Sequence, residues 1–389
     1  MSNLIPYSRQ HIDKKDILSV NKAIKSDLIT TGKFVETFEK NLKKYFKSKY
    51  VSVCSSGTAA IHLALLAIGA KKNDVIILPS INFVAAENMS KLIGVKIFFA
   101  DVDEKTGQVN YETLVNCVKK NKIKKIKAFF VSYIGGNIFD IQDFIKFKKR
   151  YKCFFIEDAC HALGSTYELN QKKYRVGNCK HSDISTFSFH PLKSITTGEG
   201  GAISTNKKSF YNKINLLRNH GFDRKLQNKK KNKVIISKEV GFNYRMSDLN
   251  CALGISQLSR ISKFIKKRND IFRRYEYNLK NLDIVKLIKT KNRTQSSYHL
   301  VLLLINFSKI RINKNNLRMF LIKNKITTQI HYYPFFLKSK NINFKKNYNG
   351  AINYYYKTLS LPVYFKLSLK KVDYICEKLK DIISKNTKQ

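Results

Sequence analysis

One lysine of this chain stands in a setting that could make it reactive. Lys193 follows the apolar run at 184–189 and precedes the glycine-rich segment at 197–201. A lysine that is removed from water has a lowered pKa, and its amine can then form a Schiff base. In a chain with so many lysines, a solvated surface residue is the ordinary alternative, but the aromatic and hydroxyl-bearing neighbours of Lys193 favour the reactive one.

Two further groups that could do chemistry stand at the end of another apolar run. Asp158 and His161 belong to the string Phe-Phe-Ile-Glu-Asp-Ala-Cys-His-Ala at 154–162. A carboxylate at the carboxyl end of a strand lies where ligand sites gather in open α/β sheets, and it could pair with a cationic cofactor atom. The ordinary alternatives are that Asp158 caps the next helix and that His161 is a hydrogen-bonded structural residue.

Small and hydroxyl-bearing residues at 55–58, Ser-Ser-Gly-Thr, separate a predicted strand from a predicted helix. Backbone N–H groups at such a helix start point outward and can bind an anion. An ordinary serine or threonine N-cap explains the same residues about as well. The chain has no G-x-x-x-x-G-K-[ST] string and no G-x-G-x-x-G string, which disfavours a nucleoside triphosphatase and a dinucleotide enzyme.

A fourth polar segment lies at 241–247, Gly-Phe-Asn-Tyr-Arg-Met-Ser, ahead of another predicted helix. Asn243 and Arg245 could donate hydrogen bonds to a phosphate or a carboxylate. Such residues cap helices at least as often, so the segment alone predicts no site.

Three of the four segments together suggest a site for pyridoxal phosphate. Gly57 and Thr58 would cradle the phosphate, and Asp158 would provide the acid for the pyridinium nitrogen. Lys193 would supply the Schiff-base amine. The combination, rather than any one segment, makes this prediction.

The elements that must position these residues alternate between short apolar strands and longer segments of helical period. Helical spacing predicts helices at 58–68 and 141–150. Ser247 is expected to cap one long helix that runs through Leu249, Leu253, Leu258, Ile261 and Ile265. Nearly continuous apolar runs predict the strands 50–54, 75–78, 95–100, 126–132, 153–157, 184–189 and 202–205. This pattern is typical of the α/β class with a mostly parallel sheet buried on both faces.

The pattern changes after about residue 268, where a smaller α+β unit begins. We expect a large α/β domain over residues 1–265 and a small C-terminal α+β domain over residues 266–389. The stretch at 225–238 is the best candidate for a mobile basic loop. The small domain is expected to end in a helix that has Val372, Ile375, Leu379 and Ile382 on one face.

The high positive charge of the chain could indicate a nucleic-acid-binding protein. The balance of 74 Lys and Arg against 27 Asp and Glu gives a formal net charge of +47 over 389 residues, which attracts anions. The positive residues are spread along the chain, and it has no zinc-finger spacing, no basic region with heptads and no RNA-recognition signature. We therefore expect solvated charged faces and no specific nucleic-acid partner.

The cysteines and the longest apolar stretch bear on the compartment. Seven cysteines are an odd number, and they show no C-x-x-C spacing, which disfavours a disulfide framework and a metal site. The longest apolar stretch, at 59–70, contains His62 and is too short to cross a bilayer. The first residues lack the apolar core of a signal peptide. We expect a soluble, cytoplasmic protein with no membrane partner and no metal.

Two strings carry a resemblance to a known family. Phe-Ser-Phe-His-Pro-Leu-Lys-Ser-Ile-Thr-Thr-Gly-Glu-Gly-Gly at 187–201 and Glu-Asp-Ala-Cys-His-Ala-Leu-Gly at 157–164 resemble the motifs of the DegT family of pyridoxal-phosphate-dependent nucleotide-sugar aminotransferases. The resemblance extends from about Pro6 to the C-terminus. It implies fold type I, the aspartate-aminotransferase-like fold, in which the large domain binds the cofactor.

Three segments look closest to the PseC-like members of this family. They are Ile-Pro-Tyr-Ser-Arg-Gln at 5–10, Leu-Ile-Thr-Thr-Gly at 28–32 and Gln-Ile-His-Tyr at 329–332. Those members act in pseudaminic-acid biosynthesis and aminate a UDP-linked 4-keto-6-deoxy-HexNAc. The resemblance therefore implies a UDP-sugar as acceptor and L-glutamate as amino donor.

The resemblance also implies roles for individual residues. Lys193 would hold pyridoxal phosphate as the internal aldimine and later move a proton, Asp158 would keep the pyridine nitrogen protonated, and His161 would support the geometry of the ring. Asn243 would reach the phosphate from the neighbouring subunit, which implies at least a homodimer. Further residues expected at the cofactor are Ser56, Gly57, Thr58, Phe83, which would stack on the ring, and Ser188. Those expected at the nucleotide sugar are Tyr7, Asp27, Leu28, Ile29, Thr30, Gln329, His331 and Tyr332.

Three alternatives stay open at this point. The first is a sugar dehydratase of the same fold, whose members carry His where this chain has Lys193, so Lys193 favours transamination. The second is an aminotransferase for another nucleotide sugar, with a 3-keto group or a D-configured 4-keto group. The third is a basic nucleic-acid-binding protein on the same scaffold, which would have no physical need to keep Asp158, Ser188 and Lys193 together.

Overall fold

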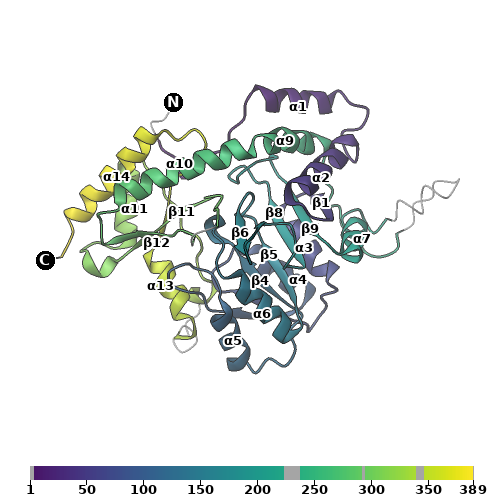
Figure 1. Ribbon diagram of the computed structural model, residues 1–389, viewed down its shortest axis with the longest axis horizontal. Coiled ribbons are helices and arrows are strands. Elements are labelled where there is room, and N and C mark those ends of the chain that lie inside the picture. The colour runs from purple at the N-terminus through teal and green to yellow at the C-terminus, as the bar shows by residue number, and fades with distance from the viewer. Residues whose placement is uncertain (1–3, 223–236, 291–293, 339–345, 389) are drawn as a thin grey trace.

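The computed structural model describes residues 4–222, 237–290, 294–338 and 346–388. Most of the basic loop predicted at 225–238 therefore lies outside the described residues. A seven-stranded sheet forms the centre of the larger part of the molecule, in the order β1-β9-β8-β5-β4-β2-β3 (Figure 1). Its strands are β1 (Tyr50–Cys54), β2 (Val75–Pro79), β3 (Lys96–Ala100), β4 (Ala128–Ser132), β5 (Phe154–Asp158), β8 (Ile184–Ser188) and β9 (Gly201–Thr205).

The sheet is mostly parallel, as predicted. Only β9 pairs antiparallel with its neighbours β1 and β8, and the other adjacent strands are parallel. All seven predicted strands are confirmed to within two residues at each end. Because β4, β5 and β8 run in the same direction, their last residues Ser132, Asp158 and Ser188 lie at one edge of the sheet.

Helices cover both faces of this sheet. Successive strand residues point to opposite faces, so Phe129 and Phe155 pack on one side while Phe130 and Ile156 pack on the other. The helices on the first side are α2 (Lys33–Phe46), α5 (Tyr111–Lys120) and α6 (Ile141–Tyr151), and those on the second are α3 (Gly57–Ala67), α4 (Ala85–Ile93) and α7 (Lys208–Leu217). The two buried cores confirm a three-layer α/β arrangement.

The helix predicted to begin after Ser247 starts as expected, but its predicted length is wrong. Ser247 Oγ accepts a hydrogen bond from Asn250 N at 3.2 Å and caps α9 (Asp248–Ser259). The backbone of Arg260 then leaves helical geometry, with φ −112° and ψ 8°, and α10 (Ile261–Leu279) begins after it. The apolar residues keep their helical spacing across the break, so the sequence pattern does not indicate that the helix is interrupted there.

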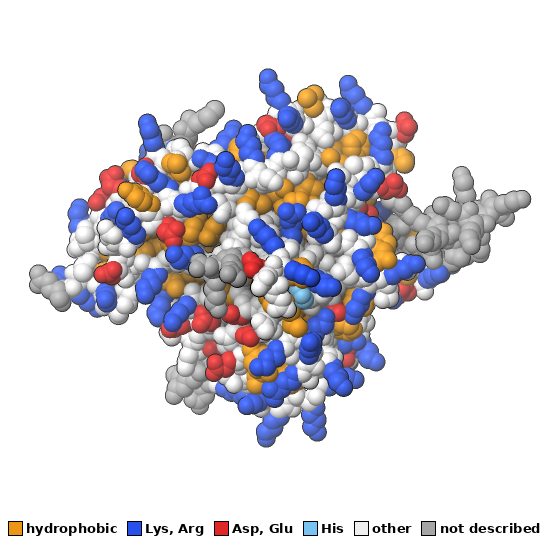
Figure 2. Space-filling model, in the orientation of Figure 1, with side chains coloured by type: hydrophobic (Ala, Val, Ile, Leu, Met, Phe, Trp, Pro, Cys, Tyr) orange, Lys and Arg blue, Asp and Glu red, His pale blue; other side chains and the backbone are white. Residues whose placement is uncertain are grey.

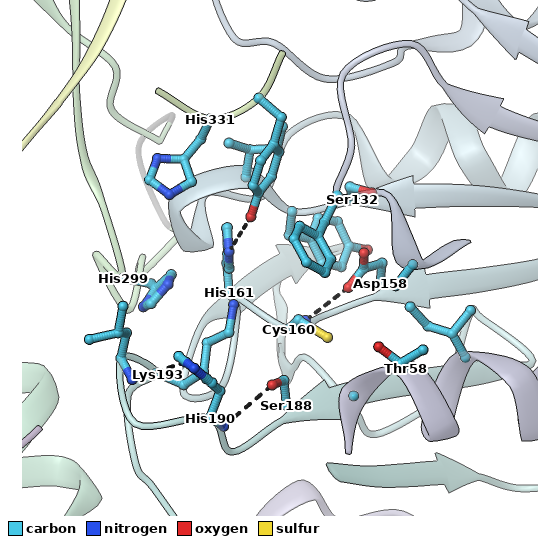
Figure 3. A pocket seen from close by; sticks show the side chains of 18 of the residues that line it. Thr58, Ser132, Asp158, Cys160, His161, Ser188, His190, Lys193, His299 and His331 are labelled. Carbon is cyan, nitrogen blue, oxygen red and sulfur yellow. Dashed lines mark hydrogen bonds between the residues drawn. The ribbon is translucent and has the colours of Figure 1, made fainter. Parts of the chain in front are cut away.

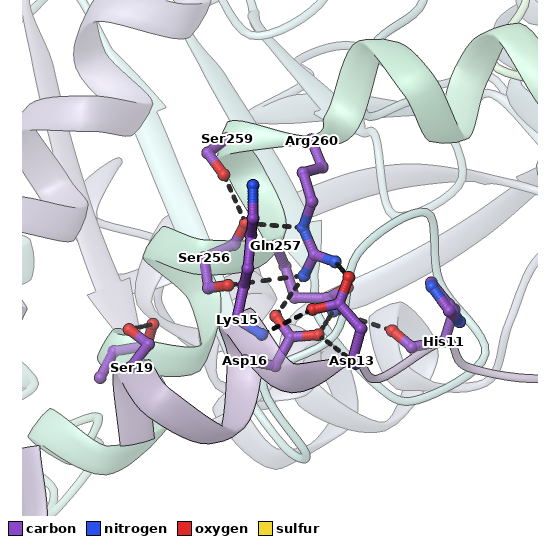
Figure 4. A network of polar contacts seen from close by, with 10 residues as sticks. His11, Asp13, Lys15, Asp16, Ser19, Ser256, Gln257, Ser259 and Arg260 are labelled. Carbon is purple, nitrogen blue, oxygen red and sulfur yellow. Dashed lines mark hydrogen bonds and ion pairs between the residues drawn. The ribbon is translucent and has the colours of Figure 1, made fainter. Parts of the chain in front are cut away.

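A polar network at this break holds α1 (Lys14–Ile24) against the junction of α9 and α10 (Figure 4). Arg260 forms ion pairs with Asp13 and Asp16. Gln257 Nε2 donates to Asp16 Oδ2 at 2.8 Å and to His11 O at 2.9 Å. These partners are at least 241 positions apart in the sequence, so the helix break depends on contacts that no local pattern reveals.

A smaller unit follows, built on the antiparallel sheet of β10 (Val285–Leu287), β11 (Val301–Ile305) and β12 (Thr358–Leu361). Its core also contains Ile5 from the start of the chain. The helix α10 runs across the predicted division between residues 265 and 266, and that division stays a prediction (Figure 1). Its other helices are α11 (Lys314–Lys323), α13 (Asn349–Lys357) and α14 (Leu369–Ser384).

Some elements differ from the prediction, and others were not predicted. The last helix buries Val372, Ile375 and Leu379 as expected, but its fully buried face ends at Ile383 rather than at Ile382. A short hairpin of β6 (Thr166–Leu169) and β7 (Lys172–Arg175) has no apolar run and was not predicted. The remaining short turns of helix are η1 (Ile134–Gly136), η2 (Phe307–Lys309), η3 (Phe335–Lys338) and η4 (Lys346–Tyr348).

The surface is rich in positive charge, and the cysteines form no disulfides. Lys and Arg side chains are scattered over the visible face of the molecule rather than gathered in one area (Figure 2). Within the described ranges, no helix combines the length and the apolar character that a membrane crossing requires. All seven cysteines are unpaired, and six of them are buried.

Candidate active site

A cavity of about 630 Å³ opens at the carboxyl edge of the large sheet, with walls from both units of the chain (Figure 3). Most of the residues predicted at the cofactor and the sugar line this cavity, although they come from segments far apart in the sequence. The structure therefore brings them together in one place. They are Tyr7, Ser56, Gly57, Thr58, Phe83, Asp158, His161, Ser188, Lys193, Gln329, His331 and Tyr332.

The start of α3 forms one wall. Ser56 Oγ accepts from Ala59 N at 3.0 Å, so the N-cap interpretation holds for the Ser56 hydroxyl. A Cβ atom on Gly57 would lie only 2.8 Å from Ser188 Cβ, so this cradle has room only for glycine. The first N–H groups of a helix have no carbonyl partner within it, and the helix dipole is positive at this end. An anion such as a phosphate fits here.

Asp158 ends β5 and is 8% exposed. Its Oδ1 accepts from Cys160 N at 3.2 Å. Residues 159–165 form turns and no helix, so the alternative that Asp158 caps a helix is wrong. The carboxylate lines the same cavity as Lys193 and can hold a cationic group there (Figure 3).

Lys193 lies in the turn that follows β8, where its backbone N donates to His190 O at 2.9 Å. Burial lowers the pKa of the Lys193 amine, and Cys160 and Asp158 act in the opposite direction. A lowered pKa leaves more of the amine neutral, which is the form that attacks a carbonyl carbon. The interpretation of Lys193 as one more solvated charge does not fit this environment.

Three buried histidines surround the amine. Burial lowers the pKa of His161 well below its ordinary value, and Lys193 acts in the same direction. The pKa of His299 is lowered in the same way, first by burial and then by its charged and imidazole neighbours. Burial also lowers the pKa of His331, to about 3. Near neutral pH all three rings are uncharged and can donate and accept hydrogen bonds without adding positive charge.

The hydrogen bonds of His161 define its tautomer. Gly135 N donates to His161 Nδ1 at 3.4 Å, and Tyr332 Oη lies 2.9 Å from His161 Nε2. Because Nδ1 accepts, the neutral ring carries its proton on Nε2 and donates it to the Tyr332 oxygen. The Tyr332 hydroxyl proton is then left to serve another acceptor.

An aromatic ring stands at the mouth of the cavity. Phe83, from the loop after β2, is 53% exposed and lies 5.7 Å from the ring of Tyr332, centroid to centroid, with the planes tilted by 55°. An exposed ring at this edge has a free face that a planar ligand can cover. This placement is compatible with the stacking role implied for Phe83.

Sequence reasoning missed several residues of the cavity, of which His299 is the most notable. It precedes β11, and its ring centroid lies 4.3 Å from that of His161. Within the part of the chain that the structure describes, its buried Nδ1 has no hydrogen-bond partner. The only signal in the sequence is one His ahead of an apolar strand. Other lining residues that were not predicted are Ser132, Tyr133, His190, Glu199 and Tyr333.

Two sets of predicted residues lie outside the cavity. Asn243 is exposed, and so are residues 27–30 of the predicted sugar-binding turn. The two sets are neighbours, because Thr30 pairs with Ser247 and Ile29 O accepts from Asp248 N at 2.9 Å. They form one surface that does not face the cavity of their own chain.

The chain is similar to known aminotransferases. The chain matches the DegT/DnrJ/EryC1/StrS aminotransferase family over residues 10–380. It is 36% identical to the UDP-4-amino-4,6-dideoxy-N-acetyl-beta-L-altrosamine transaminase of Campylobacter jejuni subsp. jejuni serotype O:23/36 (strain 81-176), over 384 residues and 98% of each chain.

Solved structures share the fold over almost the whole chain. PseC of Helicobacter pylori, an aminotransferase involved in the biosynthesis of pseudoaminic acid, superposes with a TM-score of 0.86 at 28% identity, covering 98% of this chain and 100% of that one. The PLP-form of the putative sugar aminotransferase Spr1654 from Streptococcus pneumoniae has a TM-score of 0.88 at 24% identity, covering 98% and 99%. The fold is therefore that of the pyridoxal-phosphate aminotransferases of fold type I, as predicted.

Proposed function

The chain belongs to the DegT/DnrJ/EryC1/StrS aminotransferase family, and on this premise we propose that it transfers the amino group of L-glutamate to the 4-keto carbon of a UDP-linked sugar. The acceptor is UDP-2-acetamido-2,6-dideoxy-β-L-arabino-hexos-4-ulose, and the reaction belongs to pseudaminic-acid biosynthesis. The similarity to the Campylobacter altrosamine transaminase and to Helicobacter PseC supports this choice of sugar.

Pyridoxal phosphate is the cofactor, and the cavity fits it. The cradle between Gly57 and Ser188 can receive a phosphate, and Asp158 lines the same cavity. When bound, the cofactor supplies an electron-withdrawing ring that carries the amino group from donor to acceptor. The same cavity presents the Lys193 amine.

The observation that carries the proposal is the convergence of Lys193 and Asp158 in one cavity with side chains of the smaller unit. Lys193 Nζ, whose pKa is lowered by burial, can link to the cofactor and can take up and return a proton at the substrate carbon. Asp158 holds a proton on the pyridine nitrogen through a charge-assisted hydrogen bond. His161 fixes the position of Tyr332 from the larger unit.

The smaller unit contributes the groups that we assign to the sugar. Tyr7, Gln329, His331 and Tyr332 line the cavity from that side. His331 Nδ1 lies 2.8 Å from Ser360 Oγ, which fixes its ring beside the cavity. Neutral imidazole and phenol groups can form hydrogen bonds with the hydroxyl, amide and keto oxygens of a HexNAc, and these bonds do not carry the free-energy cost of burying a charge.

We propose a homodimer in which the partner subunit's Asn243 and the partner's turn at 27–30 complete this cavity. In its own chain this surface lies outside the cavity and carries exposed apolar side chains. Leu28 is 59% exposed, Ile29 is 52% exposed and Val240 is 86% exposed. Apolar side chains gathered on a surface mark contact with another protein, and a second copy suits a surface that carries predicted ligand-binding residues.

The remaining parts of the proposal concern the compartment and the charge. Seven unpaired cysteines suit a reducing compartment, and we propose the cytoplasm. We propose no specific nucleic-acid partner for the protein. Its scattered positive charge serves to attract the anionic UDP-sugar. A reaction rate that does not change with ionic strength would contradict that role.

The experiment is a mass-spectrometric assay with L-glutamate and the UDP-4-keto-6-deoxy-HexNAc in the two configurations that differ at the carbon next to the ring oxygen. Amination of the inverted L-arabino form alone supports the proposal. Amination of the other form alone assigns the enzyme to a different nucleotide keto-sugar. If a colourless protein aminates neither, the proposal is wrong, and a non-enzymatic function on this scaffold becomes the better explanation.

A further inference from the structure

A buried carboxylate stands directly behind the site and has no part in the chemistry proposed above. Glu157 precedes Asp158 on β5 and is 2% exposed. Consecutive strand residues point to opposite faces, so Asp158 shares a face with Ile156 and the α3 side of the sheet, whereas Glu157 shares the other face with Phe155. Glu157 is not among the residues that line the cavity.

Three hydroxyl groups donate to this carboxylate. Tyr133 Oη donates to Glu157 Oε1 at 2.7 Å, and Ser182 Oγ donates to Glu157 Oε2 at 2.9 Å. Ser185 Oγ also donates to Oε2. Within the described ranges no Lys or Arg forms an ion pair with Glu157, so these neutral donors hold it. Burial raises the pKa of Glu157, and the bonds from Ser185, Tyr133 and Ser182 oppose that effect.

One donor, Ser185, belongs to β8, and the other two, Tyr133 and Ser182, adjoin β4 and β8. Val131 and Ser185 are the direct partners of Glu157 in the register of β4, β5 and β8. The same strands end in Ser132, Asp158 and Ser188, which all line the cavity from the opposite face. One carboxylate thus ties the carboxyl ends of β4 and β5 to the start of β8.

The connection through Tyr133 reaches a second site residue. Tyr133 follows β4 and lines the cavity itself. It leads into the turn whose Gly135 N donates to His161 Nδ1. A shift of Tyr133 would therefore disturb the hydrogen bond that defines the tautomer of His161.

We propose that Glu157 is a positioning residue that holds the carboxyl ends of β4 and β5 against the start of β8, in the arrangement that the cofactor requires. This inference rests on the proposed function, because it assigns Asp158 to the cofactor ring. A carboxylate suits the role because it only accepts hydrogen bonds, and three hydroxyl donors converge on it. An amide in its place would present an N–H donor to at least one of those hydroxyls, which could then no longer donate to this side chain.

The chain offers a matched control in Asp183. This acid is 3% exposed, precedes β8 and accepts from Phe155 N at 2.9 Å, so it connects the same two strands. It pairs with Lys148 and Lys207, each at 2.8 Å, and it stands at the amino end of β8, away from the cavity. Its substitution removes a buried acid that connects the same two strands and leaves the three hydroxyl donors of Glu157 in the chain.

The test compares Glu157→Gln, Tyr133→Phe and Asp183→Asn with the wild-type protein. For each protein, apoprotein is titrated with pyridoxal phosphate, the visible absorbance of the bound cofactor is followed against pH, and urea unfolding is measured without cofactor. We expect Glu157→Gln and Tyr133→Phe to weaken cofactor binding about tenfold or more and to shift the pH midpoint of the absorbance. Asp183→Asn should lower stability and leave both cofactor readouts unchanged.

Other results would overturn the inference. It fails if Glu157→Gln and Tyr133→Phe keep the wild-type affinity and pH midpoint, or if Asp183→Asn changes them as much. If Glu157→Gln does not fold, Tyr133→Phe alone decides between these outcomes. Since the readouts need only cofactor binding, a wild-type protein that binds pyridoxal phosphate but aminates no sugar contradicts the proposed function and leaves this test intact. A wild-type protein that does not bind the cofactor contradicts both.

Discussion

The hydroxyl of Tyr332 lies 2.9 Å from Nε2 of His161, although 171 positions separate the two residues in the chain. Tyr332 belongs to the segment between α11 and α13, and His161 follows β5. Their hydrogen bond joins the two units of the molecule inside the cavity that holds Lys193. The position of the smaller unit, which carries the residues assigned to the sugar, relative to the larger unit at the cavity therefore depends on this contact.

Removal of the Tyr332 hydroxyl tests that dependence. In Tyr332→Phe the Nε2–H of His161 loses its acceptor within a buried site, which should lower the free energy of unfolding by about 1–3 kcal/mol. The rate of amination should fall as well, because His161 is no longer fixed. Tyr333→Phe is the matched control for stability, since Tyr333 is 52% exposed and its change should stay within about 0.5 kcal/mol. Equal effects of the two variants would contradict the assigned role.

The glycine cradle predicts a steric effect on cofactor binding. A methyl group at position 57 would lie 2.8 Å from Ser188 Cβ, so α3 or the end of β8 must move in Gly57→Ala. Crowding of this kind costs about 1–3 kcal/mol, and we expect pyridoxal phosphate to bind about tenfold more weakly or worse. The double variant Gly57→Ala with Ser188→Gly removes the opposing carbon and should recover the thermal stability. An unchanged dissociation constant in Gly57→Ala would show that the phosphate binds elsewhere.

The buried histidines predict a stability that decreases in mild acid. In the folded state the pKa values of His161, His299 and His331 are lowered, whereas in the unfolded chain they return to about 6.5. Above that pH the rings are neutral in both states and cause no pH dependence. Below it the unfolded chain binds protons that the folded chain does not, so the free energy of unfolding falls with falling pH.

His299→Asn isolates one of these groups. The slope of the free energy of unfolding against pH, measured with urea between about pH 6.5 and 5, should be smaller in the variant than in the wild-type protein, by about one proton at most. That window lies above the ordinary pKa values of Asp and Glu. An unchanged slope would mean that His299 titrates normally in the folded state.

The contribution of Asn243 across subunits can be tested with two inactive variants. Lys193→Ala removes the amine from its own cavity, and Asn243→Ala removes the side chain that we assign to the partner's cavity. After unfolding and refolding together, half of the dimers combine one subunit of each kind, and each such dimer has one intact site. The mixture should regain about a quarter of the wild-type activity. A mixture as inactive as the separate variants would contradict sharing across the dimer.

The strands of the large sheet and the residues at their ends could be predicted because their signals are local. Buried parallel strands are short apolar runs, and the polar residue that follows each one lies at the carboxyl edge. Asp158 and Lys193 were found from such signals, and the family resemblance added Ser188 and the residues of the smaller unit.

The features that the sequence did not reveal depend on distant contacts or weak patterns. The break at Arg260 is accompanied by ion pairs with Asp13 and Asp16, and the spacing of apolar residues cannot reveal such contacts. His299 becomes part of the site only because β11 packs beside the turn of His161. The hairpin of β6 and β7 shows no apolar run, because β6 contains Glu168 and β7 contains three basic residues.

The central claim is that Lys193, alone among the many lysines of this chain, binds pyridoxal phosphate. The most direct measurement is to load the protein with the cofactor, reduce it with borohydride to trap any Schiff base as a stable amine, and locate the modified residue by peptide mass spectrometry. The account predicts one pyridoxyl group, on the peptide that contains Lys193, and none in Lys193→Ala. A modification at another lysine, or no modification in a protein that holds the cofactor, would contradict it.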